Sequence, residues 1–403
     1  MSVLSGLDRL DEYAALLNGS RIALMTNPTG VDRRLRSCVS IIGGRYNLTA
    51  LFACEHGVRG NLQAGDYVES YVDDETGVTV YSLYGSSPRM TPEMLDAFDV
   101  FVFDMQDVGA RFYTYLYSLA YAMEDCAAAG KRVVVLDRPN PLGGETVQGT
   151  LLDERFASFV GMYAMPTRYG LTIGEYARWL RDYRRLGLEL DVVPLAGWER
   201  RMYHADTGLQ WIAPSPNIPT PTTALVYSGT CVFEGTNLSE GRGTTQPFEL
   251  IGAPWLNGAE LARRMNALLN NNNRPAITGL SHAERKSVAG LLFRPVYFTP
   301  TFSKHQGELC SGVQMHVIDP RVANPFAAAL YMLQAIAGMH PDQFALLSRG
   351  EAEQGAAAQM KADLLLGADA IDMGHMDIQG LIETHEPLVR HYQEMTRVYR
   401  LYE

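Results

Sequence analysis

The first half of the chain alternates short apolar runs with segments whose apolar residues recur at helical spacing. The apolar runs are rich in Val, Ile and Phe, and they lie at residues 21–27, 48–54, 79–84, 100–105, 132–138 and 190–195. Near-continuous apolar strands with helices between them are typical of parallel sheets that are covered on both faces. The pattern therefore predicts an α/β domain of the Rossmann-like, doubly wound type, built on a mainly parallel sheet.

The second half of the chain has a different pattern. Residues 211–256 are rich in Pro, Gly, Thr and Ser and show little periodicity, and a long irregular stretch in a compact chain is usually functional. Helix and strand patterns resume beyond it and predict a smaller C-terminal α+β domain. We place the Rossmann-like catalytic domain at 1–230 and the C-terminal domain at 231–403. The first loop of the C-terminal domain, 231–256, is expected to contribute to a shared cleft.

Polar side chains follow four of the predicted strands at the point where each strand ends. They are Asn27 after the first strand, Glu55 and His56 after the second, Asp104, Gln106, Asp107 and Arg111 after the fourth, and Asp137 after the fifth. The carboxyl ends of parallel strands lie along one edge of the sheet, and open α/β sheets bind ligands in the crevice at that edge. The sequence therefore predicts that these side chains meet in one site.

These residue types suit the cleavage of a glycosidic bond. Two carboxyl groups that are close together in a cleft have diverging pKa values, so one holds a proton while the other stays ionised. Glycoside hydrolysis requires such an acid together with a base or nucleophile. The guanidinium groups of Arg59, Arg111 and Arg242 suit an anionic substrate group. Tyr113 belongs to an aromatic run against which a sugar ring can pack.

Structural interpretations of the same residues stay open. Asp107 and Asp137 are equally suited to cap a following helix, and Asp107 with Arg111 has the spacing of a helix-surface ion pair. We interpret His56 as an orienting residue and predict no metal site, because the sequence has no HxH or HExxH pattern. The chain also lacks GxGxxG, GxxxxGK[ST] and GxSxG motifs, so we predict no nucleotide cofactor and no esterase-type serine.

The loop at 229–248 places polar residues between glycines, which let a backbone approach a ligand closely. Its candidate residues are Glu234, Asn237, Glu240 and Arg242. We interpret this segment as a binding loop laid over the cleft. A solvated interdomain linker is the alternative.

Composition narrows the choice of partner. The chain of 403 residues has a formal net charge of −11, which disfavours nucleic acid or an anionic membrane surface as the partner. No stretch reaches the roughly 20 apolar residues of a membrane span, and the N-terminus lacks a basic segment followed by an apolar one. We therefore expect a small carbohydrate partner and a cytoplasmic location for the sequence as given, with export of a longer precursor as the alternative.

Several long motifs resemble those of a known family. They are EHGVRG, FDMQDVGARFYTY, DRPNPLGG, SPNIP, EGTNLSEGRGTTQPF and GAPW, in this order. The chain resembles the exo-β-N-acetylmuramidase family of peptidoglycan-active glycoside hydrolases, formerly a domain of unknown function, over nearly its whole length. The resemblance implies a Rossmann-type fold with an added C-terminal domain. It also implies release of N-acetylmuramic acid (MurNAc) from the non-reducing end of peptidoglycan fragments, without metal or nucleotide.

The resemblance also implies roles for residues. Glu55 is the first choice for the acid/base carboxylate. The second catalytic role stays open among the Asp104, Gln106 and Asp107 pattern and the loop residues Glu234 and Glu240. One of the three arginines would hold the lactyl carboxylate that distinguishes MurNAc from N-acetylglucosamine (GlcNAc).

One position departs from the family pattern. The family's P-x-R-H-G-x-T segment has a histidine where this chain has Tyr169. A retaining, an inverting and a substrate-assisted mechanism all stay open. Two other functions also stay open: a non-catalytic protein that binds muropeptides or acidic sugars, and a hydrolase of a small anionic ester or amide that uses Cys54 as nucleophile.

Overall fold

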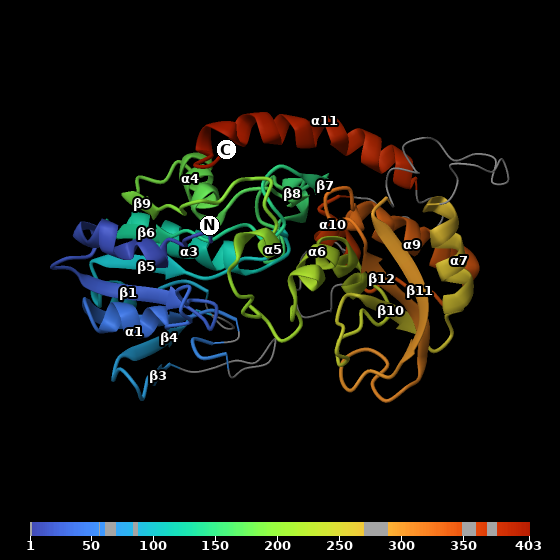
Figure 1. Cartoon of the computed structure of the whole chain (residues 1–403), viewed down its shortest axis with the longest axis horizontal. Coiled ribbons are helices and arrows are strands. Elements are labelled where there is room, and N and C mark those ends of the chain that lie inside the picture. Colours follow the sequence, from blue (N-terminus) through green and yellow to red (C-terminus); the bar gives the residue numbers. More distant parts are fainter. Residues whose placement is uncertain are drawn as a thin grey trace.

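Two domains lie side by side in the computed structural model, which describes residues 2–55, 57–60, 70–83, 88–269, 289–348, 360–368 and 377–403. The larger, Rossmann-like domain is drawn in blue to green in Figure 1, and the smaller one in yellow to orange. The last long helix, α11 (Ile378–Thr396), lies along both domains. The predicted fold class, a mainly parallel sheet with a smaller C-terminal domain, is confirmed.

The large sheet has seven strands in the order β3-β4-β2-β1-β5-β6-β9. The strands are β1 (Arg21–Thr26), β2 (Asn47–Ala53), β3 (Tyr71–Val72), β4 (Thr79–Ser82), β5 (Val100–Asp104), β6 (Arg132–Leu136) and β9 (Leu190–Val193). Every neighbouring pair is parallel except β3 with β4. Numbered along the chain, the parallel strands follow the 3-2-1-4-5-6 order of dinucleotide-binding folds, whose switch point lies between β1 and β5.

Both faces of this sheet are covered, as the apolar strand pattern predicts. On one face Ile22 and Leu24 of β1 pack with the helices η1 (Leu7–Leu16) and α1 (Cys38–Gly43). On the other face Ala23 and Met25 join the core formed with α3 (Tyr115–Ala128) and α4 (Ile173–Tyr183). Successive strand residues point to opposite faces, so a strand buried on both sides has no polar alternation.

Smaller elements complete the Rossmann-like domain. They are α2 (Pro92–Asp96), β7 (Gln148–Leu151), η2 (Glu154–Phe156), β8 (Pro166–Arg168) and α5 (His204–Thr207). Strands β7 and β8 form a separate antiparallel pair. Helix α2 begins at Thr91, whose hydroxyl accepts the Met94 amide, and Pro92 occupies the first helical turn, where its missing N–H costs nothing.

The C-terminal domain is built on an antiparallel sheet in the order β10-β12-β11. Its elements are α6 (Pro221–Thr230), η3 (Cys231–Gly235), β10 (Leu250–Ala253), α7 (Gly258–Leu269), β11 (Leu291–Phe298), β12 (Cys310–Val317), α9 (Pro325–Met339) and α10 (Lys361–Leu366). The sequence pattern of 211–256 missed α6, because this helix is buried on nearly all sides and therefore shows no amphipathic stripe. The predicted boundary at residue 230 would place α6 in the Rossmann-like domain, whereas α6 packs on α9 and is described here with the smaller domain. The boundary itself stays a prediction.

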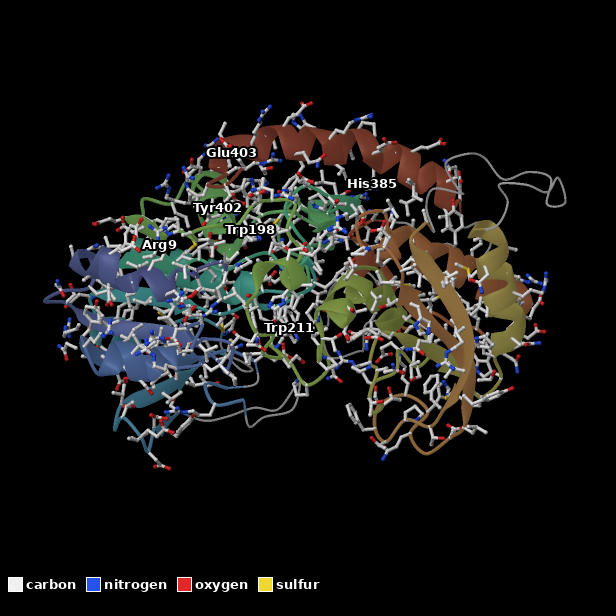
Figure 2. All side chains as sticks on the ribbon, in the orientation of Figure 1. Arg9, Trp198, Trp211, His385, Tyr402 and Glu403 are labelled. Carbon is white, nitrogen blue, oxygen red and sulfur yellow. The ribbon has the colours of Figure 1, made fainter. Side chains whose placement is uncertain are left out.

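The C-terminus returns to the Rossmann-like domain after α11 and the short helix η4 (Arg397–Tyr399). The Tyr402 ring lies edge-on to Trp198 with 5.2 Å between centroids, and the Glu403 carbonyl accepts the Arg200 amide at 2.9 Å (Figure 2). Midway along α11, Nδ1 of His385 accepts the Leu151 amide at 3.1 Å. Near the start of α11, the Tyr331 hydroxyl of α9 donates to the side chain of Gln379 at 3.3 Å, so the last helix contacts both domains.

Candidate active site

Glu55 lies directly beyond β2 at the carboxyl edge of the sheet and is half-buried. Its Oε2 accepts a hydrogen bond of 2.9 Å from the Thr114 hydroxyl. Thr114 immediately precedes α3, the helix that follows β5. A hydrogen bond therefore joins the segments that follow β2 and β5.

Two of the predicted acids at this edge lie in the interior instead. The Asp104 carboxylate is fully buried and forms a two-point ion pair with Arg138 at 2.6 and 2.9 Å. Asp137 is also fully buried and accepts hydrogen bonds from Thr172, Gly174 and Tyr402 at 2.8, 2.8 and 2.5 Å.

The contacts of Asp137 hold the first turn of α4 and the C-terminus of the chain. Burial raises its pKa to about 7. The structural interpretation is therefore the one that its position supports. Neither Asp104 nor Asp137 presents an oxygen to a ligand.

Arg111 is also placed away from any substrate. Its side chain is fully buried, and its two terminal nitrogens donate to four backbone carbonyls at 2.7 to 2.9 Å, those of Thr150, Met165, Leu365 and Leu366. Burial lowers its pKa to about 10. The prediction that Arg111 binds a substrate carboxylate is therefore not supported, because its charge joins β7 and β8 to α10. It forms no ion pair with Asp107 either.

Asp107 has one carboxylate oxygen that accepts hydrogen bonds and one buried oxygen that accepts none from the described residues. Its Oδ2 accepts the Tyr169 hydroxyl and the Gly109 amide, the latter at 2.7 Å, whereas Oδ1 is buried with no partner among the described residues. Burial raises the pKa of Asp107 to about 6, although the hydrogen bonds from Tyr169 and from backbone amides oppose the rise. The carboxyl group is therefore able to gain or lose a proton near neutral pH.

Tyr169 stands at the position where this chain departs from the family pattern. The side chain is almost fully buried, and its hydroxyl bonds to Asp107 rather than facing solvent. The residue that departs from the family pattern therefore acts on the Asp107 carboxyl group.

Five aromatic rings, which we call the aromatic bridge, connect the sheet edge to the C-terminal domain. They are Phe112, Tyr113, Tyr115, Tyr227 and Phe248. The Tyr113 ring lies 4.7 Å from that of Tyr115 and 6.2 Å from that of Tyr227, which in turn lies 4.7 Å from Phe248. Because Tyr115 and Tyr227 come from α3 and α6, the bridge spans both domains.

Tyr113 lies at the sheet end of the aromatic bridge, beside both acids. Its hydroxyl is buried without a partner among the described residues. Burial raises the pKa of Tyr113, and the nearby charges of Glu55 and Asp107 raise it further. The charges of Glu55 and Asp107 therefore both act on Tyr113.

A network of charges lies at the other end of the bridge. Arg242 contacts Glu234 at 2.6 Å and Glu240 at 3.3 Å, and its guanidinium lies 5.1 Å from the centre of the Phe248 ring. The side chains of Glu234 and Arg242 are 33% and 22% exposed, whereas that of Glu240 is 2% exposed. Glu234 and Arg242 are therefore the members of this network that reach solvent.

The remaining predicted residues make protein contacts. Arg59 pairs with Asp73 at 2.9 Å and with Glu75 at 3.0 Å. The Asn237 side chain bonds to backbone groups of Gln343 and Ala345 within the C-terminal domain. His56 lies outside the described residues.

Asn27 and Gln106 lie at the switch point of the sheet. Asn27 accepts from Thr29 and has a buried Nδ2 without a partner among the described residues. The side-chain amide of Gln106 donates to the backbone carbonyls of Asp107 and Pro139. Both side chains are therefore largely engaged in holding the loops that follow β1 and β5.

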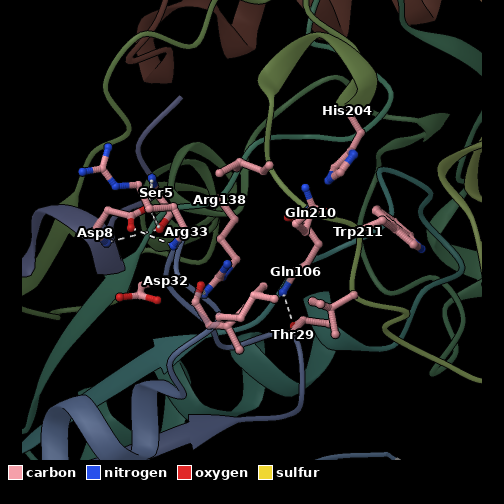
Figure 3. Close-up of a pocket in the computed structure, with 14 residues that line it drawn as sticks. Ser5, Asp8, Thr29, Asp32, Arg33, Gln106, Arg138, His204, Gln210 and Trp211 are labelled. Atoms are coloured by element: carbon pink, nitrogen blue, oxygen red, sulfur yellow. Dashed lines mark hydrogen bonds between the residues drawn. The ribbon is translucent and has the colours of Figure 1, made fainter. Parts of the chain in front are cut away.

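A narrow pocket opens at the same switch point, between the loops that follow β1, β5 and β6 (Figure 3). Thr29, Gln106, Arg138, His204 and Trp211 are among the residues that line it. Its free volume is about 30 Å³, which admits a few water-sized groups and not a sugar ring.

Cys54 does not have the environment of a nucleophile. It is 3% exposed, and its Sγ lies 3.3 Å from Sδ of Met105. Burial raises the pKa of the thiol, so the reactive thiolate is disfavoured. This environment disfavours the alternative of a cysteine hydrolase.

Sequence reasoning missed Thr114, Tyr227 and Lys304. Thr114 stands within the FDMQDVGARFYTY motif, so its neighbours pointed to it, and Tyr227 belongs to the missed helix α6. Lys304 gave no signal, because it lies in an irregular connection between β11 and β12.

A doubly wound domain with partly exposed carboxylates on two domains and buried aromatic rings between them is compatible with a carbohydrate-active enzyme. Comparison with known families agrees with this class. The family descriptions "Exo-beta-N-acetylmuramidase NamZ, N-terminal" and "C-terminal" match residues 22–222 and 225–402. The chain belongs to this family of glycosidases.

Individual relatives give the same result. The chain is 42% identical to the peptidoglycan beta-N-acetylmuramidase NamZ of Bacillus subtilis (strain 168), over 99% of this chain and 91% of the relative. Two crystal structures of DUF1343 family proteins from Bacteroides fragilis NCTC 9343 share the fold, with TM-scores of 0.85 and 0.75 at 33% and 27% identity. Each alignment covers 100% of this chain and 99% of the other.

No helix in the part of the chain that the structure describes is both long and apolar enough to cross a membrane. No three His, Cys, Asp or Glu side chains within that part are grouped so that they could hold a metal ion.

Proposed function

We propose that this protein releases MurNAc from the non-reducing end of short peptidoglycan fragments, with Glu55 as the acid/base. The observation that carries the proposal is the position of Glu55, a half-buried carboxylate at the carboxyl edge of the sheet, bonded to Thr114 and close to Tyr113. A catalytic acid must reach both the substrate and a supply of protons. Glu55 meets this requirement, whereas Asp104 and Asp137 are fully buried.

Hydrolysis then requires two proton movements. Glu55 donates a proton to the glycosidic oxygen as the bond between this oxygen and the anomeric carbon breaks. A water molecule then bonds to the anomeric carbon and gives up a proton to a carboxylate. We assign the second carboxyl role to Asp107, because its raised pKa lets it exchange a proton near neutral pH. Whether the configuration is retained or inverted depends on the carboxyl separation, about 5 Å or ~6.5–9.5 Å. Participation of the substrate's acetamido group stays open.

Substrate selection follows from the loop end of the aromatic bridge. Arg242 is partly exposed, and its planar guanidinium is suited to hold a carboxylate at two points. We propose that it holds the lactyl carboxylate, which MurNAc carries and GlcNAc lacks. The aromatic bridge would support the sugar ring between this anchor and Glu55.

The first experiment compares a chromogenic β-MurNAc substrate with its GlcNAc analogue. We expect release of the chromophore from MurNAc alone, and loss of that activity in Glu55→Gln while the fold is kept. Glu386→Gln serves as the matched control, because Glu386 is 63% exposed on α11 and paired with Arg390. Equal turnover of both substrates would reject the specificity, an active Glu55→Gln would reject the acid, and binding of MurNAc without any product would indicate a binding protein instead.

A further inference from the structure

Lys304 contacts the loop that carries Glu234 and Arg242. Its ammonium group donates to the carbonyls of Phe233 and Thr236 at 2.8 and 2.9 Å. It also lies 2.8 Å from Oε2 of Glu240, an ion pair without the geometry of a hydrogen bond. Backbone carbonyls of the loop therefore hold two of the three ammonium hydrogens, and the charge lies beside Glu240.

The ion pairs of this region form a chain with one buried member, Glu240. Lys304 pairs with Glu240, Glu240 with Arg242, and Arg242 with Glu234. Glu240 is 2% exposed, and a buried carboxylate requires opposite charge nearby. Burial raises the pKa of Glu240, and Lys304 and Arg242 both oppose that rise. Among the described residues, Lys304 and Arg242 are the cations paired with Glu240, so loss of Lys304 would leave Arg242 to compensate this carboxylate.

The backbone around Lys304 holds it in place. Ser303 and His305, on either side, have φ angles of 71° and 56°, in the left-handed region that residues other than glycine rarely adopt. Contacts fix both ends of the segment. The Thr301 amide and hydroxyl donate to the Gly243 carbonyl at 3.0 and 2.9 Å, and Nε2 of His305 lies 2.7 Å from the Asn237 carbonyl.

We propose that Lys304 is a positioning residue for substrate selection. It takes up the charge of Glu240 and fixes the backbone on both sides of Glu234, so the Arg242 guanidinium stays turned toward the exposed side, where an anionic sugar binds. This inference depends on the proposed role of Arg242. Its distinguishing consequence is an effect on substrate binding and selectivity with little effect on the chemical step.

The test is steady-state kinetics of Lys304→Met with the β-MurNAc substrate. We expect KM to rise about tenfold with kcat changed less than about threefold, since binding is weakened and the acid is untouched. Lys304→Arg should restore most of the affinity, because it keeps the charge. The double variant Lys304→Met with Glu240→Gln should recover part of it, because removal of the buried charge lets Arg242 return to its exposed position.

Several outcomes would overturn the inference. A folded Lys304→Met enzyme with unchanged KM would do so, as would a loss that appears in kcat alone. If Lys304→Met does not fold, the double variant is compared with Glu240→Gln alone, and equal KM values there would reject the role of Lys304. Inactivity of the unaltered enzyme toward MurNAc would instead reject the proposed function, so the two failures are distinguishable.

Discussion

The two ends of the aromatic bridge differ in the charges that surround their buried carboxyl groups. At the sheet end, Asp107 has no cation beside it among the described residues, and burial raises its pKa to about 6. At the loop end, Glu240 is as deeply buried but has Lys304 at 2.8 Å and Arg242 at 3.3 Å. Burial raises the pKa of both groups, but Lys304 and Arg242 oppose the rise at Glu240, whereas no described cation opposes it at Asp107. The sheet end therefore suits proton transfer, and the loop end suits recognition of a charged substrate.

The largest effect is expected from a substitution of Asp107, at the sheet end of the bridge. Asp107→Asn keeps an oxygen for Tyr169 and Gly109 but removes the exchangeable proton. If Asp107 serves in proton transfer, we expect kcat to fall about 10²- to 10⁴-fold, the usual contribution of general acid–base catalysis. Turnover of the β-MurNAc substrate measures this.

The matched control is Asp99→Asn at the opposite edge of the sheet, where the carboxylate is 47% exposed and paired with Arg21. The control should keep full activity. An Asp107→Asn enzyme that retains more than about a third of its kcat would assign Asp107 to structure, and Glu234 would become the second carboxyl group, because that factor is far below the expected loss.

The loop end is tested at Arg242. Arg242→Met should raise KM for β-MurNAc roughly 10- to 100-fold, because a charged hydrogen bond contributes about 1.5–3 kcal/mol. Any slow turnover of the GlcNAc analogue should change little. Arg263→Met on α7, where the side chain is 67% exposed, provides the control. Parallel loss with both sugars would contradict the assignment of Arg242 to the lactyl carboxylate.

The difference between the two ends also explains what the sequence could predict. Apolar runs and the polar residues after them predicted the sheet and the edge where Glu55 lies, because strand burial and chain direction are local properties. Burial of a polar side chain is not local. Arg111, Asp104 and Asp137 carried the same signals as Glu55, but contacts with distant segments bury them: α10 for Arg111, Arg138 for Asp104 and Tyr402 for Asp137. Lys304 reaches its loop across about 70 residues of sequence, with a separation of 68 to the Thr236 carbonyl.

Asp137 is a third buried carboxyl group, and its raised pKa makes the stability of the protein depend on pH. Its pKa of about 7 in the folded protein lies above its ordinary value of 3.8, so the folded protein keeps a proton that the unfolded chain releases. This contribution to the free energy of unfolding is complete below about pH 4 and is lost as pH rises through about 7. Asp107 acts in the same direction over a narrower range.

Urea unfolding at pH 5 and pH 8 measures this dependence. We expect the unaltered protein to lose stability between the two values, and Asp137→Asn to lose less. The control is Asp99→Asn, because Arg21 lowers the pKa of Asp99 to about 2, so this carboxyl group is ionised in the folded and the unfolded protein throughout that pH range. An equal slope for the unaltered protein and Asp137→Asn would show that Asp137 is ionised in the folded state throughout.

The smallest effect is expected from Tyr169→Phe, which tells whether Asp107 acts as an acid or as a base or nucleophile. Tyr169 donates to the Asp107 carboxylate and opposes the rise in its pKa, so Tyr169→Phe should raise that pKa by roughly one unit, the worth of a hydrogen bond to a charged group. The limb of the kcat–pH profile that Asp107 controls then moves to higher pH. Movement of the acidic limb identifies Asp107 as a base or nucleophile, because activity requires its ionised form, and movement of the basic limb identifies it as an acid. Tyr176→Phe removes an equally buried hydroxyl that donates to the Leu116 carbonyl at 3.1 Å, so its profile should stay unchanged. A Tyr169→Phe profile that coincides with that control would mean that neither limb reports on Asp107.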